Sequence, residues 1–167
     1  MSHLMSHWKR RRFTFLTKLA GASGAVSVRA IRKVRDDANC RRLMTAPGIG
    51  AVVAASYVGA IESPANFKHA RDVGAWVGLT PRRFQSGEMD YDGHISRRGD
   101  ERLRALLYEA ATVILTRVRS ASALRSWRSR SVGFKRAAVA LARKLAVVLH
   151  VMWKTRKNFD PNHRLAA

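Results

Sequence analysis

The sequence predicts an all-α fold in which a long loop or small hairpin is inserted between helices. Three observations carry this prediction. Two segments repeat apolar residues at helical spacing, three short helix-forming stretches precede them, and residues 80–99 are broken by proline and glycine with little periodic pattern. The chain has 167 residues, 47% of them hydrophobic and 26% charged, so it can form one domain with a real core.

Three short helices are expected between residues 36 and 78. The first covers residues 36–44, and the turn Pro47-Gly48-Ile49-Gly50 must end it because proline and glycine interrupt helices. Small and apolar residues make 51–61 a closely packed second helix. The third begins at Ser63-Pro64, as N-cap and first helical position, and Gly78 stops it. Its apolar residues are Phe67, Val73, Trp76 and Val77.

Residues 80–99 form the inserted loop or small hairpin, and we expect the functional site there. A loop of this length in a compact domain usually serves a function. Asp100 or Gly99 caps the next helix, in which apolar residues recur at helical spacing from Leu103 to Ile114. A stretch rich in serine and arginine, 120–133, leads to a last helix over 134–153.

Positive charge is the most unusual property of the chain. Lys and Arg number 32 against 11 Asp and Glu, which gives a formal net charge of +21. A polyanion would relieve the resulting repulsion, so nucleic acid is the first partner to expect. Between Glu109 and Asp160 there is no acid, although merely solubilising charges are normally mixed in sign. We divide the chain into a poorly ordered basic arm (1–35), a folded domain (36–160) and a tail (161–167).

Membrane and export functions fit the sequence poorly. Arg143 and Lys144 split the apolar stretches near the carboxyl end, which are too short to span a bilayer. Arg10-Arg11-Arg12-Phe13 is similar to a twin-arginine export signal, but Lys18 interrupts the apolar region behind it. The single Cys40 cannot form an internal disulfide. We expect a cytoplasmic, nucleoid-associated protein without a membrane partner, and an exported basic protein is the alternative.

A metal site is not expected in this chain. Asp100 and Glu101 suit the cap and the first turn of the following helix, where they complement its dipole. Only the loop acids are then left for a two-metal nuclease site. The histidines share no metal-ligand spacing. The acids clustered in the sequence are Glu88, Asp90, Asp92, Asp100 and Glu101, and the histidines are His69, His94 and His150.

The turn Pro47-Gly48-Ile49-Gly50, set between two short helices, has the signature of a helix-hairpin-helix motif. Its glycines would let the backbone approach a phosphate, and the second helix would offer unpaired N–H groups. The alternative is an ordinary tight connection between packed helices, and the charge of +21 favours DNA. Trp127 and Trp153 are candidates for stacking on bases, although tryptophans at helical spacing more often lie in the core.

Ser86 is the candidate nucleophile. Its hydroxyl lies beside Gly87 in the inserted segment, with arginines on both flanks, as attack on a phosphodiester would require. An ordinary turn serine is the alternative. The flanking residues are Arg82, Arg83, Arg97 and Arg98.

Several motifs occur in a fixed order over residues 34–160. Together they resemble the carboxyl-terminal transposase domain of the bacterial insertion-sequence 110/116/902 family. The motifs are Leu43-Met-Thr-Ala-Pro-Gly-Ile-Gly50, Asp72-Val-Gly-Ala-Trp-Val-Gly-Leu-Thr-Pro-Arg82, Gln85-Ser-Gly-Glu88, Gly93-His-Ile-Ser-Arg-Arg-Gly-Asp100 and Arg143-Lys-Leu145.

The resemblance implies DNA recombination guided by a bridge RNA, with a serine nucleophile and a covalent phosphoserine intermediate. Ser86 matches the family's Ser-Gly position best, and Ser96 is the reserve candidate. Guanidinium groups would hold the phosphate and stabilise its extra charge. Those groups belong to Arg82, Arg83, Arg97 and Arg98.

The chain also departs from the family. Members carry, before this region, a RuvC-like domain whose carboxylates bind divalent metal, whereas residues 1–35 are a basic stretch. We therefore expect a truncated or split copy that does not cut DNA alone and uses Mg²⁺ only with that domain, in cis or in trans. We also expect a homo-oligomer. The alternative is a non-enzymatic basic protein that binds nucleic acid, such as a nucleoid or ribosome-associated factor.

Overall fold

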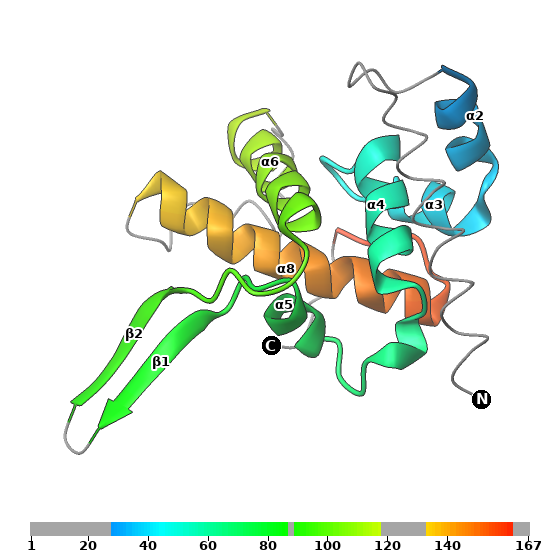
Figure 1. The fold of residues 1–167 in the computed structure, drawn as a ribbon. Helices are drawn as coiled ribbons and strands as arrows, with labels where there is room; N and C mark the ends of the chain where they lie inside the picture. Colours follow the sequence, from blue (N-terminus) through cyan, green and yellow to red (C-terminus); the bar gives the residue numbers. More distant parts are fainter. Residues whose placement is uncertain (1–27, 87–88, 118–132, 162–167) are drawn as a thin grey trace.

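The computed structural model describes residues 28–86, 89–117 and 133–161 (Figure 1). Their element order is α2 (Val28–Asp36), α3 (Ala38–Leu43), α4 (Ala51–Ile61), the 3₁₀ turn η1 (Pro64–Asn66), α5 (Asp72–Trp76), β1 (Pro81–Ser86), β2 (Met89–Ile95), α6 (Glu101–Arg117) and α8 (Phe134–Thr155). The predicted all-α class with an inserted hairpin is confirmed. None of the helices in these ranges is long and apolar enough to cross a bilayer.

Helix α8 is the central element of the domain. Helices α3, α5 and α6 pack against it, and one broad face of it is buried (Figure 1). The fully buried Tyr57 of α4 donates its hydroxyl proton to the carbonyl of Ala146, at 2.7 Å. Burial raises the pKa of this phenol, which keeps the donor protonated. The bond ties α4 to the middle of α8.

Helix α2 lies partly within the segment that we expected to be a poorly ordered arm. Val34 is buried and Ala30 packs beside it, whereas Arg32 and Arg35 are exposed. Burial of an apolar face at a spacing of four residues stabilises a helix. Residues 28–35 of the expected basic arm thus belong to α2, and the rest of the arm lies outside the described residues.

The prediction of a single helix from Ser63 to Gly78 is wrong. Ser63 does act as a cap, since its Oγ accepts a hydrogen bond from the N–H of Ala65 at 3.3 Å, but only the short turn η1 follows. Phe67 has an extended backbone and packs edge-to-face on the ring of His150, with centroids 5.8 Å apart. This tertiary contact overrides the helical pattern, and the helix resumes only as α5.

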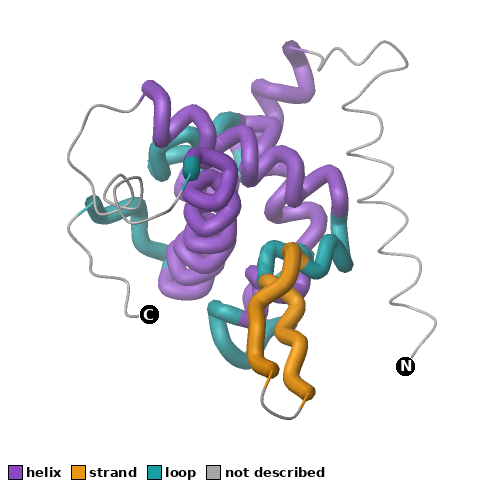
Figure 2. Tube along the Cα trace, turned by 90° about the vertical axis from the view of Figure 1, so that its left-hand side faces the viewer, coloured by secondary structure: helices purple, strands orange, loops and turns teal. Residues whose placement is uncertain are grey.

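The inserted segment is an antiparallel hairpin of β1 and β2, in which Pro81 pairs with Ile95 and Ser86 with Met89. It projects from the helical body (Figures 1 and 2). Two strands alone are only marginally stable in water. The projecting hairpin must therefore be held where it leaves the body.

The hairpin base, which we define as residues 76–80 and 96–99, is locked by two glycines. Gly78 and Gly99 have φ values of +80° and +92°. A Cβ on Gly78 would collide with the carbonyl oxygen of Arg98, and one on Gly99 with that of Trp76. Backbone bonds from the N–H of Ser96 to Thr80 and from that of Arg97 to Gly78 close the contact, at 2.8 and 3.1 Å.

Arg104 of α6 completes the hairpin base. Its Nη1 donates hydrogen bonds to the carbonyl oxygens of Val77 and Arg98, at 3.1 and 3.5 Å. One guanidinium thus joins both segments of the base to the first turns of α6. The direction in which the hairpin leaves the body is fixed by backbone contacts rather than by exposed side chains.

His150 is the one buried polar or charged residue among those described. Its Nε2 lies 3.0 Å from the carbonyl oxygen of Pro64 and must be the protonated nitrogen, because a carbonyl only accepts. Its buried Nδ1 has no hydrogen-bond partner in the described part of the chain. Burial lowers the pKa of this imidazole and is the largest effect; the Pro64 bond raises the pKa, and smaller effects follow from Lys154, which lowers it, and Asp72, which raises it.

Gly99→Ala should unfold the domain more easily than Gly133→Ala. Both glycines have a φ of +92°, but a Cβ on Gly133 meets nothing within 4 Å. The control should lose about 1 kcal/mol of unfolding free energy from its backbone alone. Gly99→Ala should lose about 3 kcal/mol or more, because the collision with Trp76 is added. Urea unfolding measures both, and equal losses would show that the hairpin base adapts.

Acid should weaken the fold through His150. The folded state keeps this imidazole neutral, so the unfolded chain alone takes up a proton as the pH falls below about 6.5. Stability is then lost by up to about 1.4 kcal/mol per pH unit until the lowered folded pKa is reached. In urea unfolding between pH 7.5 and 5.5, His150→Gln should lose less stability than the wild type. A parallel loss in both proteins would contradict this role.

Candidate nucleic-acid interface

The turn Pro47-Gly48-Ile49-Gly50 joins α3 to α4 as predicted, but half of it points inward. Gly48 has a φ of +75°, and a Cβ there would lie 2.8 Å from the carbonyl oxygen of Ala110 in α6. The side chain of Ile49 is buried. Gly48 is thus required for packing against α6.

Gly50 is the open residue of the turn. It is exposed, has an ordinary extended backbone, and a Cβ built on it meets nothing within 4 Å. It is the N-cap of α4, and no side chain caps the helix there. The first N–H groups of α4 have no partner within the helix and are available to an acceptor from outside. Of the turn predicted to bind phosphate, Gly50 and the start of α4 are the part with access.

Thr45 braces the other side of this turn. Its hydroxyl donates to the carbonyl of Arg42 at 2.7 Å and accepts from the N–H of Phe159 at 2.9 Å. The chain that follows α8 is therefore tied to the end of α3. The turn is held between α6 on one side and this segment on the other, so its geometry is set before any ligand binds.

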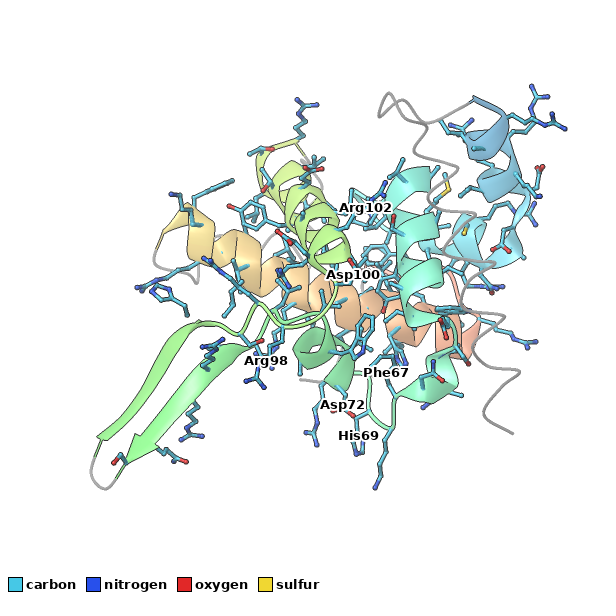
Figure 3. All side chains as sticks on the ribbon, in the orientation of Figure 1. Phe67, His69, Asp72, Arg98, Asp100 and Arg102 are labelled. Carbon is cyan, nitrogen blue, oxygen red and sulfur yellow. The ribbon has the colours of Figure 1, made fainter. Side chains whose placement is uncertain are left out.

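Ser86 lies at the far end of β1, exposed and opposite Met89. Ser96, Arg97 and Arg98 lie at the other end, in the hairpin base, and Figure 3 labels Arg98 there. The backbone of Arg82 lies four residues before that of Ser86, which is about 13 Å along the strand. Its Nη2 donates to the carbonyl of Ser96 at 3.3 Å, and so lies at the base as well.

The structure therefore separates groups that the sequence placed together. Ser86 stands at the tip, whereas exposed guanidinium groups gather around Ser96 at the base. Proximity in the sequence suggested one cluster, but antiparallel pairing sets the two ends of a hairpin apart. Arg83 is exposed in mid-strand, and its backbone lies opposite that of Asp92 in the register of the hairpin.

Ser96 is closer to guanidinium groups but is engaged by the fold. Its N–H donates to Thr80 and its carbonyl accepts from Arg82.

The acid at the start of α6 has the role expected of it. Asp100 Oδ1 accepts a hydrogen bond from the N–H of Leu103, at 2.8 Å, which is an N-cap contact. Within the described ranges, no group of three or more His, Cys, Asp or Glu side chains comes together to hold a metal ion.

Trp76 is a candidate that sequence reasoning missed. It was placed among the apolar residues of the expected third helix, yet 41% of it is exposed at the end of α5. Its ring meets that of Phe67 edge-to-face at 5.9 Å. The break in the helix removes Trp76 from the core, and no local pattern announces that break. The prediction that Trp153 stacks on bases is wrong, because its ring is buried against Tyr57. Trp127 lies outside the described residues.

Comparison with known proteins places the chain among transposases. The family model described as "Transposase IS116/IS110/IS902 family" matches residues 40–127. A transposase for an insertion sequence element of Coxiella burnetii is 30% identical over 136 residues, which cover 79% of this chain and 37% of the relative. A putative transposase of Sinorhizobium fredii is 37% identical over 125 residues, covering 72% and 32%.

A third relative, a transposase for an insertion sequence element of Yersinia enterocolitica, is 36% identical over 121 residues, covering 70% of this chain and 36% of its own. The chain spans about a third of the length of these relatives. The family match covers the turn before α4, the hairpin with Ser86 and the whole of α6. The chain belongs to the IS116/IS110/IS902 family of transposases.

Proposed function

We propose that this domain binds DNA during transposition and supplies Ser86 as the nucleophile for strand exchange. The observation that carries the proposal is the exposed Ser86 at the tip of a hairpin whose base is locked. A hydroxyl that projects from the helical body can reach a phosphate of a DNA strand that the body binds at another point. Membership of the transposase family supports DNA as the substrate.

The proposed step exchanges one phosphodiester for another. Ser86 Oγ attacks a DNA phosphorus, a base takes the serine proton, and the bond to one DNA oxygen breaks; that oxygen takes up a proton from a general acid, so that this strand end departs as a hydroxyl. A hydroxyl of another strand then attacks the phosphoserine and releases Ser86. The number of phosphodiester bonds is conserved, so the exchange needs no external energy source.

The base in this step has to come from a second unit. Arginine cannot accept the serine proton at neutral pH. The carboxylate domain that the family resemblance implies, joined in cis or supplied in trans, would carry divalent metal and the base. The part described here binds and positions DNA and holds the nucleophile. A bridge RNA and a second copy of the chain complete the proposed complex, which would work on chromosomal DNA in the cytoplasm.

The arginines of the hairpin base would bind phosphates away from the cut. The pairing of Pro81 with Ile95 and of Ser86 with Met89 makes the hairpin about 16 Å long from base to tip. For a hairpin lying along a duplex, that length is about five base steps of one strand. Arg82, Arg97 and Arg98 would thus fix the register of the strand that Ser86 attacks.

A non-enzymatic DNA-binding protein is the second candidate. One observation favours it: the formal net charge of +21 supports nucleic-acid binding without any reaction. Charge and the open start of α4 suffice for binding alone. The two candidates differ in one product, a covalent bond between Ser86 and DNA.

Gly50→Val should weaken duplex DNA binding roughly tenfold, because its side chain would cover N–H groups that hydrogen-bond a phosphate. Fluorescence anisotropy at several salt concentrations measures this, and wild-type affinity should fall steeply with salt. Circular dichroism should show an intact fold. Gly48→Val should instead destabilise the fold, because its Cβ would press on Ala110.

The matched control is Ala65→Val, which adds bulk at an exposed position beyond the opposite end of α4. Its DNA affinity should equal that of the wild type. Unchanged affinity in a folded Gly50→Val variant would mean that the start of α4 does not contact phosphate.

Ser86→Ala should abolish a covalent protein–DNA adduct and leave DNA affinity nearly intact. The adduct requires the hydroxyl, whereas binding depends on groups elsewhere in the domain. The wild-type chain is mixed with a carboxylate domain and bridge RNA from a close relative and a nicked suicide substrate. Denaturing gels then detect the adduct, and peptide mapping locates the linkage.

Two comparisons sharpen this experiment. The chain without the carboxylate domain should form no adduct, because nothing removes the serine proton. Ser96→Ala should keep some adduct. An adduct that survives Ser86→Ala and disappears with Ser96→Ala would transfer the nucleophile's role to the hairpin base.

A further inference from the structure

We propose that Trp76 is a stacking platform for an unpaired DNA base, bordered by arginines that hold the adjoining phosphates. The inference rests on the proposed function only in taking DNA as the partner. It concerns binding and does not require that Ser86 be a nucleophile. Nothing in the fold needs a tryptophan exposed to this extent at the end of α5.

The ring of Trp76 is exposed but held in position. Phe67 meets it edge-to-face at 5.9 Å, and Phe67 in turn packs edge-to-face on the buried His150 of α8 at 5.8 Å. This row of rings runs from the surface into the core. An anchored ring loses little conformational freedom on binding, which makes it suited to receive a flat ligand.

The surroundings of α5 are strongly basic. Arg98 adjoins the helix because Gly99 touches the backbone of Trp76 (Figure 3). The side chain of Arg143 lies across Gly74, with its Cγ 3.0 Å from where a Cβ would stand. Both guanidinium groups are exposed, and no hydrogen bond or ion pair of their own is found in the described part of the chain. Lys68 and Arg71 precede α5 and are exposed as well.

The acid of this region is already engaged. Asp72 is half-buried at the first position of α5, and its Oδ2 accepts a hydrogen bond from the N–H of His69 at 3.1 Å. An exposed aromatic ring among basic side chains fits a nucleotide, whose base is flat and whose phosphates are negative. A partner protein would seek a larger apolar surface around the ring, with fewer bordering charges.

An unpaired base is the form of DNA that fits. In a duplex the faces of each base are covered by its neighbours, so a protein ring stacks only on a base that has left the stack. Strand exchange separates strands near a cut and thereby exposes such bases. Trp76 adjoins the hairpin base, whose arginines are proposed to hold phosphates of the same strand. The site would therefore hold one base of the opened strand.

The test compares two short DNA strands of equal charge, one of thymidines and one with abasic positions in the middle. Their affinities for the full chain carrying Ser86→Ala are measured by fluorescence anisotropy, so that no covalent step contributes. The thymidine strand should bind at least roughly fivefold more tightly. Trp76→Ala should remove this preference and leave binding to the abasic strand unchanged. Trp76→Phe, which keeps a ring, should retain part of the preference.

Val113→Ala is the matched control, because Val113 is an apolar residue of α6 with a similar exposed fraction, 38%. It should keep the full preference. A preference that persists in folded Trp76→Ala would overturn the stacking site, as would a change confined to the oligomeric state. A uridine strand bound more tightly than the thymidine strand, in a way that depends on Trp76, would assign the site to RNA and overturn the DNA proposal.

This outcome is independent of the serine chemistry. If the adduct experiment fails while the preference depends on Trp76, the chain is a single-strand-binding protein and the stacking site stands. If the adduct forms on Ser86 while Trp76→Ala changes nothing, the nucleophile stands and the stacking site is wrong.

Discussion

Burial of one broad face of α8 is the constraint on which the rest of the domain depends. A helix buried in this way needs small side chains where its neighbours come close and large ones where they do not. Ala137, Ala138, Ala142 and Ala146 are buried beside Leu141, Leu145 and Leu149. Helices α4, α5 and α6 all contact α8. Tyr57 of α4 donates a hydrogen bond to its backbone, Gly74 of α5 makes room for its Arg143, and α6 packs along it. The two candidate contact regions, at Gly50 and at the hairpin, are therefore held in one frame.

The sequence predicted those elements whose signals are local. Helix α4 has the predicted bounds, Asp100 caps α6, and the segment broken by glycines is the hairpin. The failures came where a distant contact decides. Phe67 is not helical, although the pattern predicted a helix, because it packs on His150, 83 residues later in the chain. No window of sequence contains that pair, and the exposure of Trp76 follows from it.

The candidate site divides in the same way. Family resemblance and the open loop singled out Ser86 and four arginines, but sequence distance was taken for spatial distance. Pairing of β1 with β2 places Ser86 opposite Met89 and returns the chain to the base by Ile95. Likewise, Gly48 and Gly50 look equivalent in the sequence, yet one faces Ala110 and the other faces open space. Which glycine serves packing depends on where α6 lies, and that is a property of the assembled fold.

The interlocked glycines also determine how the hairpin transmits force. Gly78 and Gly99 leave no room between the two segments of the base, and Arg104 fastens both to α6. The hairpin is thus joined rigidly to the helical body at its base, so that a force on the base is passed to α5 and α6. A displacement of the hairpin base would therefore have to move α5 and α6 with it.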